Sequence, residues 1–122
     1  LLGALFGFLG VAIGAFGTHG LAAHFAAHPN REATFHTATQ YHMYHALALF
    51  AAAWLLERYP ASPARWAGML FTLGILLFSG SLYILSIFEV GIMGAVAPLG
   101  GAALLGGWLC LGITAWRAQG SA

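Results

Sequence analysis

The amino-acid sequence predicts an all-α protein, an antiparallel four-helix transmembrane bundle. The 122 residues include only four basic and three acidic side chains, and 61% of the chain is hydrophobic. Soluble domains carry about 25% charged residues. Four long apolar stretches follow one another, and the few charges fall almost entirely between them. About 20 apolar residues are enough for a helix to cross the hydrocarbon core, so the four stretches predict four spans in a single domain, residues 1–122.

The first predicted helix covers about residues 1–18 and is expected to begin upstream of Leu1, because that residue is not a methionine. Its glycines recur at spacings of four and three residues, which places them on one face. Small residues let membrane helices approach closely, so this face is expected to pack against another helix. It could instead line a cofactor. The glycines of this seam are Gly3, Gly7, Gly10, Gly14 and Gly17.

Residues 19–35 are predicted to form the longest connection, an external loop. His24 and His28 are four residues apart, a spacing that can hold a metal ion. Two histidines also fit a solvated helix face, which is the interpretation we adopt, and no metal site is assigned. A short helix in this loop would lie along the membrane surface with Leu21 and Phe25 toward lipid.

Three further helices are predicted at about residues 36–56, 63–88 and 90–116. Ser62 resembles an N-cap residue and Pro63 the first residue of the third helix, because serine caps helix ends and proline is favoured just inside them. The connection between the third and fourth helices is therefore short.

Arginines near the ends of membrane helices indicate their orientation. With four spans, both termini and the loop between the second and third helices lie on one side, together with Arg58, Arg65 and Arg117. The opposite side carries only Arg31. This bias predicts cytoplasmic termini and an external loop at residues 19–35.

Polar side chains collect in the outer half of the predicted bundle. At about 1.5 Å per residue, His45 lies about 14 Å below the outer boundary, and Ser79 has a similar depth. Pro98 frees the carbonyl of Gly94, which then needs a donor such as His45, Ser79 or Ser81. The predicted polar cluster comprises His19, Gln40, His42, His45, Ser79, Ser81, Tyr83 and Glu89.

Several interpretations of these histidines stay open. Histidines that face each other across a bundle can ligate haem. His19, His42 and His45 could bind a metal with Glu89. A proton relay is a third possibility, and hydrogen bonds that only stabilise helix packing are a fourth. The cofactor is therefore unknown. The sequence shows no Ser–His–Asp arrangement, no phosphate-binding glycine loop that leads to a lysine and no flanking pair of carboxylates, so we do not expect an enzyme.

Four segments together form a recognisable pattern. They are GAFGTHGL at 14–21, YHMYHALAL at 41–49, LFSGSLY at 77–83 and APLGG at 97–101. The chain resembles the YgdD-like family of small bacterial inner-membrane proteins, whose function is unknown. The resemblance implies four transmembrane helices in a bacterial cytoplasmic membrane and brings no established activity. The histidines at positions 24, 28 and 36 lie outside the pattern. Pro98, Gly100 and Gly101 lie within it, and we assign them to helix packing.

The leading functional hypothesis is a non-enzymatic structural or accessory component that packs against a larger membrane assembly. One alternative is a binder of a cofactor, metal or small ligand in a histidine-containing pocket. Another is an oligomeric transporter of protons or small solutes. The expected partners are the lipid bilayer and a membrane protein or further copies of the chain. A net charge of +1 argues against nucleic acid, which requires a clustered basic surface.

Overall fold

A computed structural model describes residues 1–120, which are all-helical and contain no strand. The middle of the chain is a continuous rod in which a π-helical segment, η1, separates two α-helices. The elements are α1 (Leu2–Gly20), α2 (Ala22–Ala27), α3 (Pro29–Arg58), α4 (Ala64–Gly74), η1 (Ile75–Ser79), α5 (Gly80–Phe88) and α6 (Met93–Gln119).

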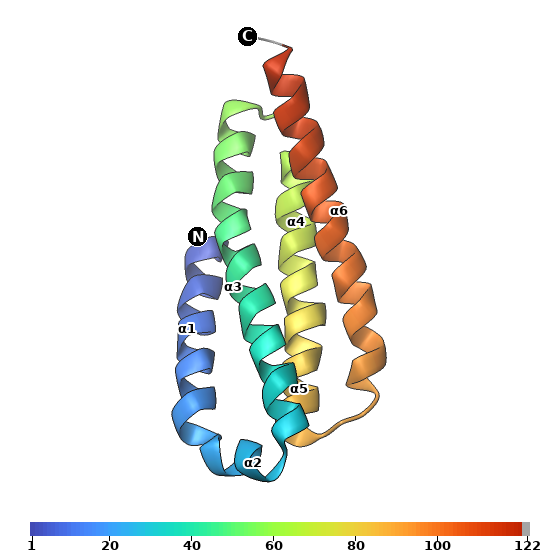
Figure 1. Ribbon diagram of the computed structural model, residues 1–122. Helices are drawn as coiled ribbons and strands as arrows, with labels where there is room; N and C mark the ends of the chain where they lie inside the picture. The colour runs from blue at the N-terminus through green and yellow to red at the C-terminus, as the bar shows by residue number, and fades with distance from the viewer. Residues whose placement is uncertain (121–122) are drawn as a thin grey trace.

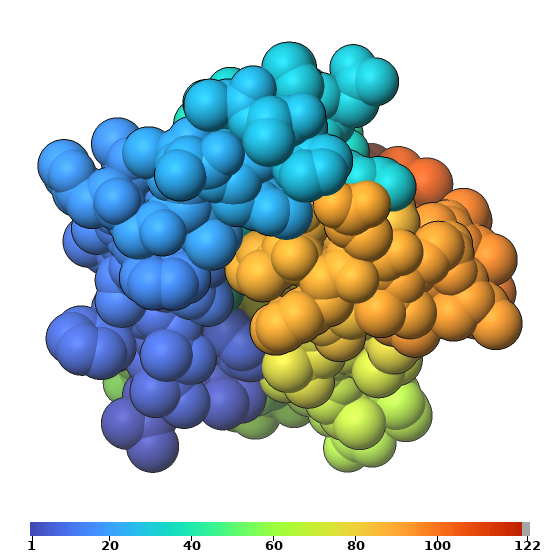
Figure 2. Space-filling view, turned by 90° about the horizontal axis from the view of Figure 1, so that it is seen from below, coloured from blue at the N-terminus to red at the C-terminus, as the bar shows by residue number. Residues whose placement is uncertain are grey.

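Four long helical segments lie side by side: α1, α3, the rod α4–η1–α5, and α6 (Figure 1). Helix α3 lies between α1 and the rod, and α6 packs mainly against α4 and η1 while also touching α3. Seen end-on, α1 and α6 lie on opposite sides of the molecule (Figure 2). Within residues 1–120, α1 and α6 do not pack extensively against each other, so the four long helical segments form an open row.

Three helical segments are long and apolar enough to cross a membrane: Leu2–Gly20, Ala64–Phe88 and Met93–Gln119. The sequence predicted a fourth such span at residues 36–56. The corresponding helix, α3, is the longest of the structure but is not in this set. The polar residues of α3 lower its mean hydropathy, so its length alone does not place it among these segments.

The predicted loop at residues 19–35 is mostly helical. Helix α1 continues to Gly20, α2 follows at once, and α3 begins at Pro29, well before the predicted start at residue 36. Proline suits the first turn of a helix because its N–H is not needed there and its φ is already helical. The prediction that Phe25 faces lipid is wrong. Phe25 is buried, and its ring lies 5.2 Å from that of Phe35.

The other boundaries differ from the predictions by a few residues. Helix α4 begins at Ala64, whose N–H donates to the Ser62 hydroxyl over 3.3 Å, while Pro63 is the cap residue. Helix α6 begins at Met93 and not at residue 90. The turn before it contains Glu89, which has a left-handed backbone with φ of 57°. This turn is consequently longer than the sequence suggested.

The core lies where α3 meets α1, α4, η1 and α6. Among the glycines, the closest approach to the backbone of another segment is at Gly100, where an added Cβ would lie 2.2 Å from the main-chain nitrogen of Phe78. Phe78 belongs to the π-helical turn, so α6 packs directly against the backbone of η1. The largest buried side chains of the core cluster are Phe6, Leu49, Phe71, Ile75 and Leu104.

Candidate functional site

The most defined polar contact between distant helices joins His45 of α3 to Trp108 of α6. His45 is buried, and its Nε2 accepts a hydrogen bond of 3.0 Å from the indole N–H of Trp108. Indole nitrogen can only donate, so Nε2 carries no proton. The proton is then on Nδ1, which lies 2.6 Å from the carbonyl oxygen of Tyr41 and donates to it. Both nitrogens are in use, and the ring is held neutral in one tautomer.

A second set of polar contacts starts at His42. Its Nδ1 lies 3.2 Å from the Tyr83 hydroxyl, and that hydroxyl donates to Thr39 over 3.4 Å. Thr39 in turn donates to the carbonyl of Phe35. With the Tyr83 proton directed at Thr39, Nδ1 of His42 is the donor to Tyr83. The resulting chain of hydrogen bonds connects α3 to α5 and ends on the backbone of α3.

Two buried polar atoms lack a hydrogen-bond partner within residues 1–120, Nε2 of His42 and Oγ of Ser79. The Phe6 ring packs edge-on at 5.7 Å from that of His42. Nε2 of His42 is therefore enclosed mainly by apolar groups.

The structure does not bring the whole predicted cluster together. His19 and Gln40 are exposed. Glu89 is also exposed and lies 3.3 Å from His28, a residue that the predicted cluster did not include. Ser81 is buried, but its hydroxyl donates within the same rod, to the carbonyl of Phe78 in η1. Inside the bundle, the members of the predicted cluster that make polar contacts between helices are His42, His45 and Tyr83.

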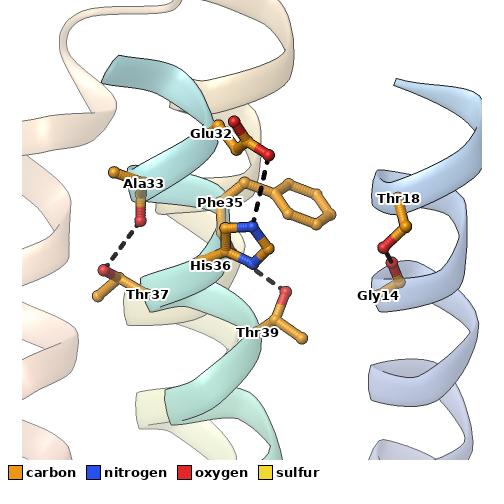
Figure 3. A network of polar contacts seen from close by, with 8 residues as sticks. All are labelled: Gly14, Thr18, Glu32, Ala33, Phe35, His36, Thr37 and Thr39. Carbon is orange, nitrogen blue, oxygen red and sulfur yellow. Dashed lines mark hydrogen bonds and ion pairs between the residues drawn. The ribbon is translucent and has the colours of Figure 1, made fainter. Parts of the chain in front are cut away.

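Threonine hydroxyls near the start of α3 are also satisfied locally. Thr37 donates to the carbonyl of Ala33 over 3.1 Å, and Thr39 bonds one turn back in the same way (Figure 3). Thr18 of α1 does likewise toward Gly14. Such bonds let hydroxyl groups lie in a helix without a partner elsewhere. They leave these side chains no free donor for a ligand.

An open groove lies between α3 and α6 next to the His45–Trp108 bond. It has a volume of about 860 Å³ and a mainly apolar lining that includes Tyr41, Tyr44, Leu105 and Trp108. Pro98 also lines this groove. Volumes of about 300–1,000 Å³ are typical of ligand sites. The arrangement combines an apolar surface with one buried imidazole that is already paired.

Residues 13–101 match the model of a family described as "Protein of unknown function (DUF423)". The chain belongs to this family. Over 117 residues it is 44% identical to UPF0382 membrane protein YwdK of Bacillus subtilis, with 94% of this chain and 93% of YwdK covered. It is 39% identical over 117 residues to UPF0382 membrane protein SSP2132 of Staphylococcus saprophyticus, with coverages of 96% and 95%.

It is also 33% identical over 117 residues to UPF0382 inner membrane protein YgdD of Escherichia coli, with 96% of this chain and 88% of YgdD covered. The resemblance to the YgdD-like family is therefore confirmed. No solved structure matches the chain. Members of the DUF423 family are named as membrane proteins, and the family has no assigned biochemical role.

In this DUF423 chain, the glycine seam of α1 faces α3 only in part. An added Cβ at Gly10 or Gly17 would overlap Met43 or Phe35, whereas nothing lies within 4 Å of that position at Gly7. On α6, Gly100 is tightly packed, while Gly101 makes ordinary contacts and Pro98 is exposed. Packing is therefore concentrated at particular glycines.

The sequence analysis missed Trp108 and Thr39 as polar partners. His45, which the sequence placed deep in the bundle, is buried and hydrogen-bonded to α6. The partner, however, is Trp108, not Ser79, Ser81 or the carbonyl freed by Pro98. Tryptophan in an apolar run was read as an apolar residue. The indole N–H of tryptophan is a donor that also needs a partner when it is buried. This property could have identified Trp108 as a candidate partner of His45 from the sequence.

Proposed function

We infer that the chain is a multi-pass protein of the bacterial inner membrane whose four long helical segments all cross the bilayer. In this proposal it acts without catalysis, by packing against another membrane protein or a second copy of itself. The termini are cytoplasmic. The observation that carries the proposal is the open row of helices, which leaves apolar grooves on a molecule that has little polar surface.

A belt of tryptophan and arginine supports the membrane placement. Trp54, Trp66 and Trp116 are exposed near the end of the molecule that carries the α3–α4 connection. The guanidinium of Arg58 lies 5.9 Å from the Trp54 ring, and that of Arg65 lies 4.9 Å from the Trp66 ring. Exposed tryptophans are enriched at membrane–water interfaces, and arginines are enriched on the cytoplasmic side. The arrangement favours cytoplasmic termini.

Helix α3 is proposed to be the fourth span although its composition is less apolar. Its polar residues His42 and His45 are buried against neighbouring helices, whereas Leu47, Phe50 and Trp54 are exposed. Polar groups that face the protein interior are tolerated at membrane depth, and apolar groups that face outward suit lipid. The part of α3 that would face lipid is therefore apolar.

The grooves support a packing role. The groove between α3 and α6 is lined by large apolar side chains, and a second groove of about 680 Å³ lies between α3 and α4 beside the start of α1. Association between membrane helices depends on close packing, for which an apolar groove offers contact on two sides. Both nitrogens of His45 are already hydrogen-bonded, so packing is a simpler use of its groove than ligation of haem or a metal.

Photo-crosslinking tests the proposal. A photoreactive benzoyl-phenylalanine at Leu105 would lie in the α3–α6 groove, where the native side chain is 69% exposed. The matched control is Val11, which is 64% exposed on α1 and lines none of the grooves named above. We expect a discrete protein adduct from position 105 in native membranes, and only lipid adducts from position 11.

The mass of the adduct identifies the partner. A product of twice the 12.8 kDa chain indicates a second copy, and any other discrete mass indicates a different membrane protein. The packing proposal is wrong if position 105 yields only lipid adducts, or if both positions give the same pattern.

A further inference from the structure

Three potential metal ligands converge at the end of the molecule opposite the α3–α4 connection. His24 and His28 come from α2 and the turn after it, and Glu89 comes from the end of α5. One ligand atom from each lies within 4.8 Å of the other two. The blue segment with α2 meets the orange segment after α5 in the end-on view (Figure 2). Glu89 is far from the two histidines in sequence, but all three residues share one accessible surface.

Each histidine has one ring nitrogen held by a main-chain carbonyl. Nε2 of His24 lies 2.9 Å from the oxygen of Ser86, and Nδ1 of His28 lies 3.0 Å from the oxygen of His24. A carbonyl only accepts, so these nitrogens carry the ring protons. The other nitrogen of each neutral ring then has a free lone pair. Metal-binding histidines are typically oriented in this way, with the second N–H on a carbonyl or carboxylate.

The free nitrogen of His28 faces a carboxylate. Nε2 of His28 lies 3.3 Å from Oε1 of Glu89. If the His28 ring is neutral, its Nε2 and the Glu89 oxygen are both hydrogen-bond acceptors. A cation between these two atoms is then needed to make their close approach favourable. That cation is either a proton on His28 or a metal ion shared by the two side chains.

The backbone around the three residues is well supported. Phe25, next to His24, is buried against Phe35 and anchors the short helix α2. Glu89 has the left-handed backbone noted above, which is uncommon for a residue with a side chain and is found where surrounding structure holds it. The backbone that carries His24 is therefore anchored by buried packing, and the one that carries Glu89 is the end of α5.

We propose that His24, His28 and Glu89 form a binding site for a divalent transition-metal ion of the zinc type. Two imidazoles and one carboxylate match the three protein ligands of open zinc sites, in which water takes the fourth position. Magnesium and calcium prefer sites made only of oxygen atoms and fit this ligand set less well. The bound ion would join α2 to the end of α5. The site does not depend on the groove between α3 and α6 or on a partner in it.

The chain contains a natural control. His36 lies 3.7 Å from Glu32 one helical turn away, and both side chains are exposed. This pair offers the same residue types without a third ligand, since it is not in the three-residue cluster. If the His28–Glu89 pair acted only through electrostatic attraction, it should respond to zinc in the same way as the His36–Glu32 pair.

Zinc titration of purified protein in detergent tests the proposal, with a tag that lacks histidine and after removal of metal by a chelator. We expect about one equivalent of zinc to bind and to raise the unfolding temperature. His24→Gln, His28→Gln and Glu89→Gln should each weaken binding about 10-fold or more, because each removes one of three ligands. His36→Gln should bind as the native chain does. Circular dichroism confirms that each variant is folded.

Cobalt(II) provides a second readout that does not depend on stability. Cobalt in a site of low coordination number gives visible absorption bands, and these should appear with the native chain and with His36→Gln but not with Glu89→Gln. Excess magnesium should not displace the cobalt. The proposal is overturned if the native chain takes up no zinc at micromolar concentrations, or if His36→Gln loses binding as much as the other variants do.

Discussion

The indole nitrogen of Trp108 and the Nε2 atom of His45 are 3.0 Å apart, although 63 positions separate the two residues in the sequence. This bond is a direct polar contact between α3 and α6. It fixes which nitrogen of His45 carries the proton, because tryptophan can only donate. The stability of the α3–α6 contact should therefore depend on this pair.

Trp108→Phe should lower the free energy of unfolding by about 1–3 kcal/mol, because it leaves Nε2 of His45 buried without a donor. The measurement is chemical unfolding in detergent. Trp116→Phe is the control, since Trp116 is 74% exposed. In a double-mutant cycle with His45→Leu, the combined loss should be smaller than the sum of the single losses. Strictly additive losses would show that the bond contributes no stability.

Two adjacent glycines of α6 should respond oppositely to alanine. Gly100→Ala places Cβ 2.2 Å from the backbone nitrogen of Phe78, which cannot move without disturbing η1. We expect a loss of about 1–3 kcal/mol in the free energy of unfolding. At Gly101 the nearest atom would be 3.7 Å away, in the Phe78 ring. Gly101→Ala should be neutral or stabilising, and equal losses at both positions would refute the close approach of α6 to η1.

The glycine seam of α1 offers a similar comparison. Gly17→Ala directs its methyl group into the buried ring of Phe35, with 2.1 Å to the nearest ring carbon. We expect lower thermal stability in detergent. Gly7→Ala meets nothing within 4 Å and replaces a poor helix former, so it should raise stability by up to about 1 kcal/mol. A destabilised Gly7→Ala would indicate that another chain occupies that face.

Cysteine labelling in intact cells tests the orientation proposed from the arginines. Cys110 is first replaced by serine, and single cysteines are placed at Asn30 and Ser62, at opposite ends of α3. An impermeant maleimide should react at position 30 and not at position 62. Labelling of both in permeabilised cells is the control for accessibility. Reaction only at position 62 in intact cells would invert the topology.

Much of the helical organisation was predictable from the sequence, for a physical reason. A helix that crosses lipid must be long and apolar, and its ends carry the charges, so spans and connections can be read from composition. The segments around residues 1–18, 63–88 and 90–116 correspond to helical rods of the structure. Burial of His45 was also predictable, because a polar group at such a depth faces the interior.

The particular partners were decided by tertiary structure. A sequence indicates that a buried imidazole needs a hydrogen-bond partner. Trp108, Ser79 and Ser81 are all chemically acceptable partners, and only the rotation of the helices in the folded protein decides which of them lies next to His45. The same holds for the helices in residues 19–35, because burial of Phe25 against Phe35 stabilises a segment that is weakly helical alone. The approach of His28 to Glu89 joins the ends of two helices. Only the tertiary structure, which places α2 beside the end of α5, brings those two side chains together.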